Sequence, residues 1–313
     1  MIDLSDVLTA ERRIHGRVRR TPMVEVGTES ARIWLKCEFL QHTGTFKARG
    51  AFNRVLAANE RDELDPAVGI VVASGGNAGL ANAYVAARIG VPATVFVPVT
   101  APVVKVDRLK QYGAVVRQVG TEYADALEAA TEHAARTGAV FCHAYDQVEI
   151  AAGAGTLALE LLADEPEIDT VVVAVGGGGL LAGVLAAVDG RARVVAAEPQ
   201  SIPTLHRALA EGRPVDVAVS GVASDSLGAR RIGDIAFDTA SRTGPVSVLV
   251  DEAEIVAARN RLWSEFRIAA EHGAATAYAA LSSGGYIPAE GERVAVVVCG
   301  ANTDPATLGT ATD

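Results

Sequence analysis

The chain is poor in the residues that mark disulfide, zinc and hydrolase chemistry. Its three cysteines, Cys37, Cys142 and Cys299, lie far apart and show no C-x-x-C spacing, so neither a disulfide framework nor a zinc ribbon is indicated. The six histidines form no H-x-x-E-H or H-E-x-x-H pattern, and no G-x-S-x-G sequence occurs. These absences argue against a zinc hydrolase and a serine hydrolase.

Positive charge and long apolar runs are also scarce. The chain carries 28 Lys and Arg against 38 Asp and Glu, a net charge of −10, which argues against a nucleic-acid partner. Residues 1–20 are charged and lack the apolar core of a signal peptide. No stretch reaches the roughly 18 uninterrupted apolar residues of a membrane span. We therefore expect a soluble, cytoplasmic protein with no membrane partner.

The 313 residues are instead rich in Ala and Val, with 50% hydrophobic residues. Continuous apolar runs such as VVVAV and VAVVVC suit strands that are covered on both faces, as in a parallel sheet. Helical patterns lie between them, including Asn77–Ile89, Ala101–Tyr112, Tyr123–Thr137 and Glu252–Ala270. The alternation predicts an α/β fold of βαβ units. We expect strands at Ile33–Lys36, Ile70–Ala73, Thr94–Val97, Ala114–Val119, Ala139–His143, Thr170–Val175, Arg193–Ala197, Val246–Val250 and Arg293–Cys299.

The run Gly176–Gly179 follows the strand VVVAV and opens the helix LLAGVLAAV. Glycines let backbone N–H groups converge on an anion, and a helix N-terminus adds partial positive charge, so a phosphate site is the favoured interpretation. A tight strand–helix turn is one alternative. Another is the dinucleotide fingerprint Gly177-x-Gly179-x-x-Ala182, with Glu198 as the acid that binds a ribose.

Lys47 lies at a glycine-bearing turn in the segment QHTGTFKARG. Taken alone, such a lysine is more often a solvated surface charge. In a desolvated pocket its amine has a lowered pKa and can form a Schiff base. Together with a phosphate loop, Lys47 becomes a candidate for binding pyridoxal 5′-phosphate (PLP), because that cofactor needs both groups.

Weaker signals lie elsewhere. The segment from Ser74 to Asn77 precedes a helix whose N–H groups could bind a carboxylate, although an ordinary N-cap is the commoner arrangement. Cys299, at the end of the last long strand, is by itself a small buried hydrophobe. Glu271 is expected on a solvated face, and Asp225 in a turn.

In this order, the segments resemble the fold type II PLP-dependent enzymes, specifically the serine/threonine dehydratase (threonine ammonia-lyase) and serine racemase group, over nearly the whole chain. Residues 34–51 resemble the family's lysine segment, residues 74–77 its substrate-carboxylate loop and residues 176–179 its phosphate loop. Cys299 falls where the family places Ser or Cys beside the pyridine nitrogen. The resemblance favours PLP over a nicotinamide cofactor.

The resemblance implies two α/β domains, each an open, mostly parallel sheet flanked by helices, in a homodimer. The small domain would span residues 45–145, and the large one residues 1–44 and 146–313. Lys47 would be catalytic. The implied cofactor-binding residues are Lys47, Phe46, Asn77, Gly176, Gly177, Gly178, Gly179, Leu180 and Cys299, and the implied substrate-binding residues are Ser74, Gly75, Gly76, Asn77 and Ala78.

The implied reaction converts a small hydroxy-amino acid, L-threonine or L-serine or both, to a 2-oxo acid and ammonia by β-elimination. Alternatives are an amino-acid racemase, a hydroxyaspartate dehydratase and, more distantly, an NAD-dependent dehydrogenase. Gly75 stands where the racemases carry a second acid/base serine, so poor racemisation is expected, and Ala78 replaces the family's common His. The segment after Glu198 lacks the second acid of the family's cation site, so no metal is expected. We also expect no appended amino-acid-sensing domain.

Overall fold

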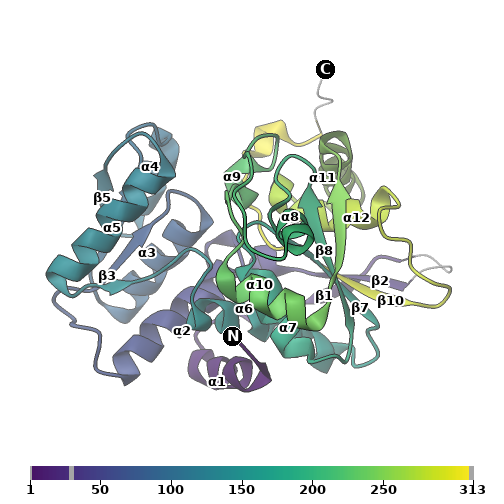
Figure 1. Cartoon of the computed structure of the whole chain (residues 1–313), viewed down its shortest axis with the longest axis horizontal. Coiled ribbons are helices and arrows are strands. Elements are labelled where there is room, and N and C mark those ends of the chain that lie inside the picture. Colours follow the sequence, from purple (N-terminus) through teal and green to yellow (C-terminus); the bar gives the residue numbers. More distant parts are fainter. Residues whose placement is uncertain (1, 28–31, 310–313) are drawn as a thin grey trace.

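The computed structural model describes residues 2–27 and 32–309 and contains two sheets (Figure 1). The larger sheet has the order β1-β2-β10-β7-β8-β9 and the smaller one the order β5-β4-β3-β6. All neighbouring strands are parallel except β1 and β2, which confirms the predicted α/β class. The strands are β1 (Met23–Glu25), β2 (Arg32–Lys36), β3 (Ile70–Ala73), β4 (Ala93–Val97), β5 (Val115–Gln118), β6 (Val140–Phe141), β7 (Thr170–Ala174), β8 (Arg193–Pro199), β9 (Val246–Val250) and β10 (Arg293–Val297).

Helices cover both sheets (Figure 1). The smaller sheet lies with α3, α4 and α5 on one side of the molecule, and α7 to α12 surround the larger sheet on the other. The strands of the smaller sheet all lie within residues 70–141, while the domain boundaries near residues 45 and 145 remain a prediction. The helices are α1 (Leu4–Ile14), α2 (Lys47–Glu60), α3 (Asn77–Ile89), α4 (Val103–Gln111), α5 (Tyr123–Thr137), α6 (Val148–Asp164), α7 (Gly179–Val188), α8 (Thr204–Glu211), α9 (Ser224–Leu227), α10 (Asp234–Thr243), α11 (Glu252–Phe266) and α12 (His272–Ser282).

The sequence patterns located every strand of the parallel sheets but missed the antiparallel edge strand β1, which has only three residues and no buried one. The predicted helix Glu252–Ala270 ends early, at Phe266. Arg267 adopts a left-handed φ of 59°, so the helical ladder cannot continue through it. The predicted strand Ala139–His143 is paired only over Val140–Phe141.

A buried ion network fixes α2 on the larger sheet. Arg49 lies two residues after Lys47, and its guanidinium donates to Glu38 and Glu160 over 2.7 to 2.9 Å. Lys36 Nζ donates to the same Glu160 carboxylate at 2.8 Å. Each charge meets an opposite charge in good geometry, which a buried ion pair requires. The network therefore holds the first turn of α2, which carries Lys47, in one position.

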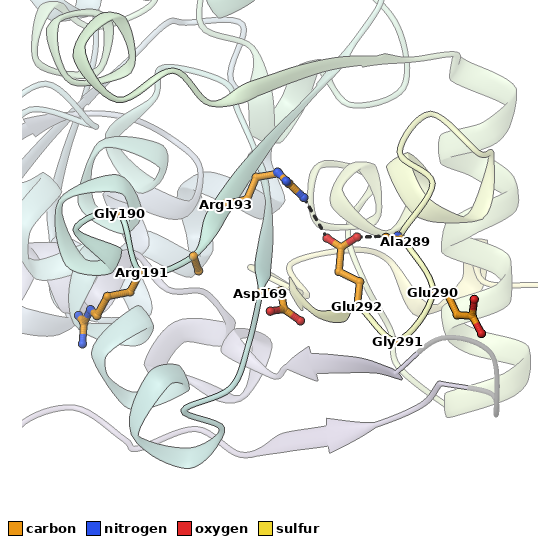
Figure 2. A pocket seen from close by; sticks show the side chains of 9 residues that line it. Asp169, Gly190, Arg191, Arg193, Ala289, Glu290, Gly291 and Glu292 are labelled. Carbon is orange, nitrogen blue, oxygen red and sulfur yellow. Dashed lines mark hydrogen bonds and ion pairs between the residues drawn. The ribbon is translucent and has the colours of Figure 1, made fainter.

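A hollow of about 450 Å³ opens where the strands of the larger sheet begin (Figure 2). We call it the amino-edge hollow; Asp169, Arg193 and Glu292 line it. Figure 2 shows Arg193 and the backbone of Ala289 turned toward the Glu292 carboxylate. Glu292 also accepts from the hydroxyls of Thr170 and Tyr286. Its acid is thus fully engaged by the protein itself.

Among the described residues, no helix has the length and apolar content needed to cross a membrane.

Candidate active site

The carboxyl ends of β7 and β10 face the carboxyl end of β3 across a cleft, and two connected cavities lie there. The inner cavity, of about 50 Å³, is enclosed between the larger sheet and α2. The outer cavity, of about 480 Å³, extends toward the smaller sheet. Every residue predicted to bind the cofactor lines the inner cavity, and every residue predicted to bind substrate lines the outer one. The structure thus brings the whole predicted set together, while the role of each residue stays a prediction.

Lys47 is the first residue of α2 and lines both cavities. Its Nζ donates to the carbonyl of Ala144 at 2.8 Å and lies 5.0 Å from the centre of the Phe46 ring. Burial lowers the pKa of Lys47 to about 8, and the nearby Cys299 and Glu271 offset only part of this effect. At this pKa roughly a fifth of the amine is neutral near physiological pH, far more than for an ordinary lysine, and this fraction can act as a nucleophile or base.

The tetraglycine loop forms a cradle at the N-terminus of α7. Gly178 is the N-cap, with a φ of +87° that a side chain rarely adopts. Ala182 N donates to Gly178 O, so the amides of residues 179–181 lie before the helical ladder and remain available to an anion. A Cβ atom at Gly177 would lie 2.4 Å from the Tyr145 ring, and one at Gly179 would lie 2.6 Å from Tyr145 O. Only glycines fit this loop.

The loop after β3 places backbone at the mouth of the site. Gly76 is the N-cap of α3, and the segment from Ser74 to Ala78 lines the outer cavity. Ser74 Oγ accepts from Gly76 N at 3.3 Å, which holds the turn open. The amides at the start of α3 lie where a carboxylate could bind them, and this role stays a prediction.

The prediction that Glu271 lies on a solvated face is wrong. The residue is 5% exposed and lines the inner cavity beside Lys47 and Cys299. Asn77 Nδ2 donates to both of its carboxylate oxygens, at 2.8 and 3.1 Å. Burial raises the pKa of Glu271 to about 7, and the hydrogen bond from Asn77 lowers it only in part. Glu271 comes just after the predicted helix Glu252–Ala270, where a charged residue is usually solvated, so the local sequence carried no signal of its burial.

Cys299 is 4% exposed and lines the same cavity. Burial raises the pKa of its thiol far above the usual range, and the nearby Glu271 carboxylate adds to the effect. The sulfur therefore stays a neutral thiol, a weak hydrogen-bonding group rather than an ion.

The dinucleotide alternative loses its acid in this structure. Glu198 is fully buried in β8, and its carboxylate accepts from the amides of Leu205 and His206 and from Thr204 Oγ1. It caps the start of α8 and cannot reach a ribose. The fingerprint around Gly177 therefore has no nucleotide partner at the predicted position.

Ser226 and Tyr145 also belong to the site, although no sequence pattern marked Ser226. Both line the inner and the outer cavity. The Ser226 hydroxyl is buried and finds no hydrogen-bond partner within the described part of the chain. Tyr145 packs its ring and carbonyl against the glycine loop.

A lysine with a depressed pKa and a backbone cradle for an anion fit the two ends of PLP, an aldehyde that bonds to an amine and a phosphate. Lys47 and the loop at residues 176–179 would hold those ends in the inner cavity. In an α/β fold with two parallel sheets, this combination defines the class of PLP-dependent enzymes.

Comparison with known proteins agrees with this class. The family model described as pyridoxal-phosphate dependent enzyme matches residues 14–300, so the chain belongs to that family. It is 33% identical to an L-threonine ammonia-lyase of Thermotoga maritima, over 97% of this chain and 76% of the relative. It is 34% identical to the phenylserine dehydratase of Ralstonia pickettii, over 98% of this chain and 95% of that one. The structure of maize serine racemase matches with a TM-score of 0.89 and 29% identity, over 98% and 95% of the two chains. The predicted family is confirmed.

Proposed function

We propose that the protein is a cytoplasmic PLP-dependent ammonia-lyase that converts L-threonine, L-serine or both to a 2-oxo acid and ammonia. The observation that carries the proposal is the placement of Lys47, whose depressed-pKa amine lines both the cofactor cavity and the substrate cavity. The similarity to an L-threonine ammonia-lyase over nearly the whole chain supports it. Like its implied relatives, the protein would act as a homodimer.

Each group has a separate task in this proposal. Bound PLP withdraws electrons from the α-carbon of the amino acid. The neutral Lys47 amine removes the α-proton, for which it must lie close to that carbon. The loop from Ser74 to Ala78 binds the substrate carboxylate through its amides. The site closes against water when the smaller sheet and its helices approach the larger one.

Cys299 bears on the course of the reaction. The neutral thiol of Cys299 would be a weak partner for the pyridine nitrogen of bound PLP, whereas a carboxylate there would keep that nitrogen protonated. With so weak a partner at Cys299, prompt loss of the β-hydroxyl would be favoured. The neutral thiol therefore supports elimination over transamination.

Racemisation is the alternative with the same cofactor. It needs a second acid/base on the face of the substrate opposite Lys47, and Gly75 offers only backbone at the position where the racemases carry serine. We therefore expect the protein to form little D-amino acid relative to 2-oxo acid.

A β-hydroxy amino acid with an aromatic side chain is a second candidate substrate. The outer cavity of about 480 Å³ is spacious for threonine, and Tyr123 and Ala78 lie on its wall. The relative from Ralstonia pickettii is a phenylserine dehydratase. An acidic hydroxyaspartate is the further alternative, which Arg230 and Arg231 on the same wall would attract.

The test is release of 2-oxo acid by the PLP-loaded protein from L-threonine, L-serine, phenylserine and 3-hydroxyaspartate. We expect turnover of at least one of these substrates, and its loss in Lys47→Ala. A yellow, PLP-loaded protein that releases no 2-oxo acid from any of them would overturn the proposed reaction. Chiral analysis of residual serine separates a lyase from a racemase.

A further inference from the structure

A chain of side-chain hydrogen bonds links the two halves of the cleft floor. Arg108 Nη2 on α4 donates to Asn302 Oδ1 at 2.9 Å. Asn302 Nδ2 donates to Thr43 O at 2.9 Å and to Asn77 Oδ1 at 2.7 Å. Asn77 Nδ2 then donates to Glu271. The chain runs from the surface of the smaller lobe to the acid beside Lys47.

Chemistry fixes the direction of this chain at its outer end. A guanidinium only donates hydrogen bonds, and a backbone carbonyl only accepts them. The oxygen of the Asn302 amide must therefore face Arg108, and its nitrogen must face Thr43. Reversing the amide would place its nitrogen against the Arg108 guanidinium, donor to donor, and its oxygen against the Thr43 carbonyl, acceptor to acceptor.

The direction of Asn302 determines that of Asn77. The second N–H of Asn302 points at Asn77, so Asn77 must present its oxygen there and its nitrogen to Glu271, on the wall of the inner cavity. We propose that Asn302 is a positioning residue, which makes Asn77 a hydrogen-bond donor toward the bound cofactor. This inference rests on the proposed PLP site, in which Asn77, as the family resemblance implies, would hydrogen-bond the phenolic oxygen of the cofactor.

The segment that carries Asn302 is built to hold still. Ala301 N donates to Gly44 O at 2.9 Å, and the buried Arg259 donates to Thr303 Oγ1 at 2.8 Å. Asn302 is thus anchored on both sides of its own backbone. With its backbone anchored and its amide held by Arg108 and Thr43, Asn302 keeps its orientation when Asn77 changes. A reversal of Asn302 would instead force Asn77 to reorient.

Asn302→Asp and Asn302→Ala distinguish positioning from packing. Aspartate has the same shape and keeps its attraction to Arg108, but its carboxylate only accepts hydrogen bonds, so it opposes both the Thr43 carbonyl and the Asn77 oxygen. Asn77 would then turn its nitrogen to Asp and its oxygen to the cavity. Alanine removes the constraint without imposing the wrong orientation.

The measurement is the affinity of the apoprotein for PLP, followed by its visible absorbance, together with thermal unfolding. We expect Asn302→Asp to weaken PLP binding about 30-fold and Asn302→Ala only about 3-fold, because an opposed polar contact costs more than a missing one. The pH midpoint of the bound cofactor's absorbance should rise in the Asp variant. Equal affinities, or an Ala variant weaker than the Asp variant, would overturn the inference, since simple packing predicts that order.

Arg108→Glu provides a second route if Asn302→Asp does not fold. Glutamate at the outer end only accepts, so it competes with the Thr43 carbonyl for the Asn302 nitrogen and favours the reversed amide, while every residue that lines the inner cavity stays unchanged. Arg108→Met, which removes the donor alone, is its matched control. We expect weaker PLP binding in the Glu variant than in the Met variant, and equal affinities contradict the proposal. If the wild-type protein binds PLP yet releases no 2-oxo acid, the reaction is overturned while these affinity orders still decide the role of Asn302.

Discussion

The two edges of the larger sheet treat a buried glutamate in opposite ways. At the amino edge, Glu292 accepts hydrogen bonds from Thr170, Tyr286 and the backbone of Ala289. Burial raises its pKa, but these donors outweigh burial and hold the pKa below its usual value. At the carboxyl edge, burial of Glu271 outweighs the hydrogen bonds from the Asn77 side chain and the Asn302 backbone, and its pKa rises to about 7.

The difference shows what separates a structural polar cluster from a reactive one. Donors sufficient for the charge leave a carboxylate ionised and inert, as at Glu292. A deeply buried charge with too few partners, donors for a carboxylate or acceptors for an ammonium, changes its charge near neutral pH, as at Glu271 and Lys47. At the amino edge of the sheet, the protein's own hydrogen bonds compensate the buried charge. At the carboxyl edge they do not. A bound ligand can therefore supply missing partners only at the carboxyl edge, where Glu271 and Lys47 line the inner cavity.

The largest effect on ligand binding at the carboxyl edge should come from adding a methyl group to the phosphate-binding loop at residues 176–179. Gly178→Ala would put a Cβ atom 2.4 Å from Ala236 Cβ, and Gly178 has a φ of +87°. We expect the loop to shift and the affinity for PLP to fall about 100-fold or more, because the converging amides lose their geometry. The measurement is PLP titration of the apoprotein.

Gly190→Ala is the matched control at the amino edge. Gly190 has a φ of +75°, so the left-handed strain is similar, yet a Cβ atom there would meet nothing within 4 Å. Its cost is about 1–2 kcal/mol of stability, with PLP affinity unchanged. Equal PLP affinities in the two variants would mean that the loop at residues 176–179 is not the phosphate cradle.

Glu271→Gln and Glu292→Gln should differ in the sign of their pH dependence. A carboxyl whose pKa rises from 4.5 to about 7 on folding binds its proton more tightly in the folded state. Its contribution to stability therefore falls as pH rises from 4.5 to 7, by roughly 3 kcal/mol at about 1.4 kcal/mol per pKa unit. Glu271→Gln removes this loss. Urea unfolding of the apoprotein should thus show the variant gaining on wild type between pH 5 and pH 8.

Glu292→Gln should behave in the reverse manner. A depressed pKa contributes stability that is present above the unfolded value and lost as pH falls through the folded one. This variant should be destabilised equally at pH 5 and pH 8, and the difference should shrink only in stronger acid. Parallel curves for the two variants would contradict the contrast between the edges.

The sequence was sufficient for the fold because its signals are local. Continuous apolar runs give parallel strands wherever both faces are covered, and the strand Val246–Val250 and the helix Asn77–Ile89 have the predicted bounds. The glycine loop was also predictable, since four adjacent glycines are hard to explain without a close approach of backbone.

The polar groups behind the site were not predictable in the same way. Glu271 and Asn302 are distant from Asn77 in sequence, and their contacts exist only because α3 and α12 begin, and β10 ends, at the same cleft. The local sequence suggested a solvated Glu271, whereas in the structure the residue is buried and its pKa is raised. Such reversals come from tertiary packing, which no local pattern encodes.

The smallest expected effect concerns hydroxyls at the two edges. Thr170 Oγ1 donates to Glu292, whereas Ser226 Oγ has no partner among the described residues and lines both site cavities. A buried hydroxyl without a partner costs about 1 kcal/mol or more. Ser226→Ala should therefore leave the unliganded protein about 1 kcal/mol more stable while raising KM about 5-fold, because a ligand loses a hydrogen bond. Thr170→Val should do the opposite, lowering stability by about 1–2 kcal/mol without changing KM. Urea unfolding and steady-state kinetics on both variants check this, and an unchanged KM in Ser226→Ala would show that no ligand satisfies that hydroxyl.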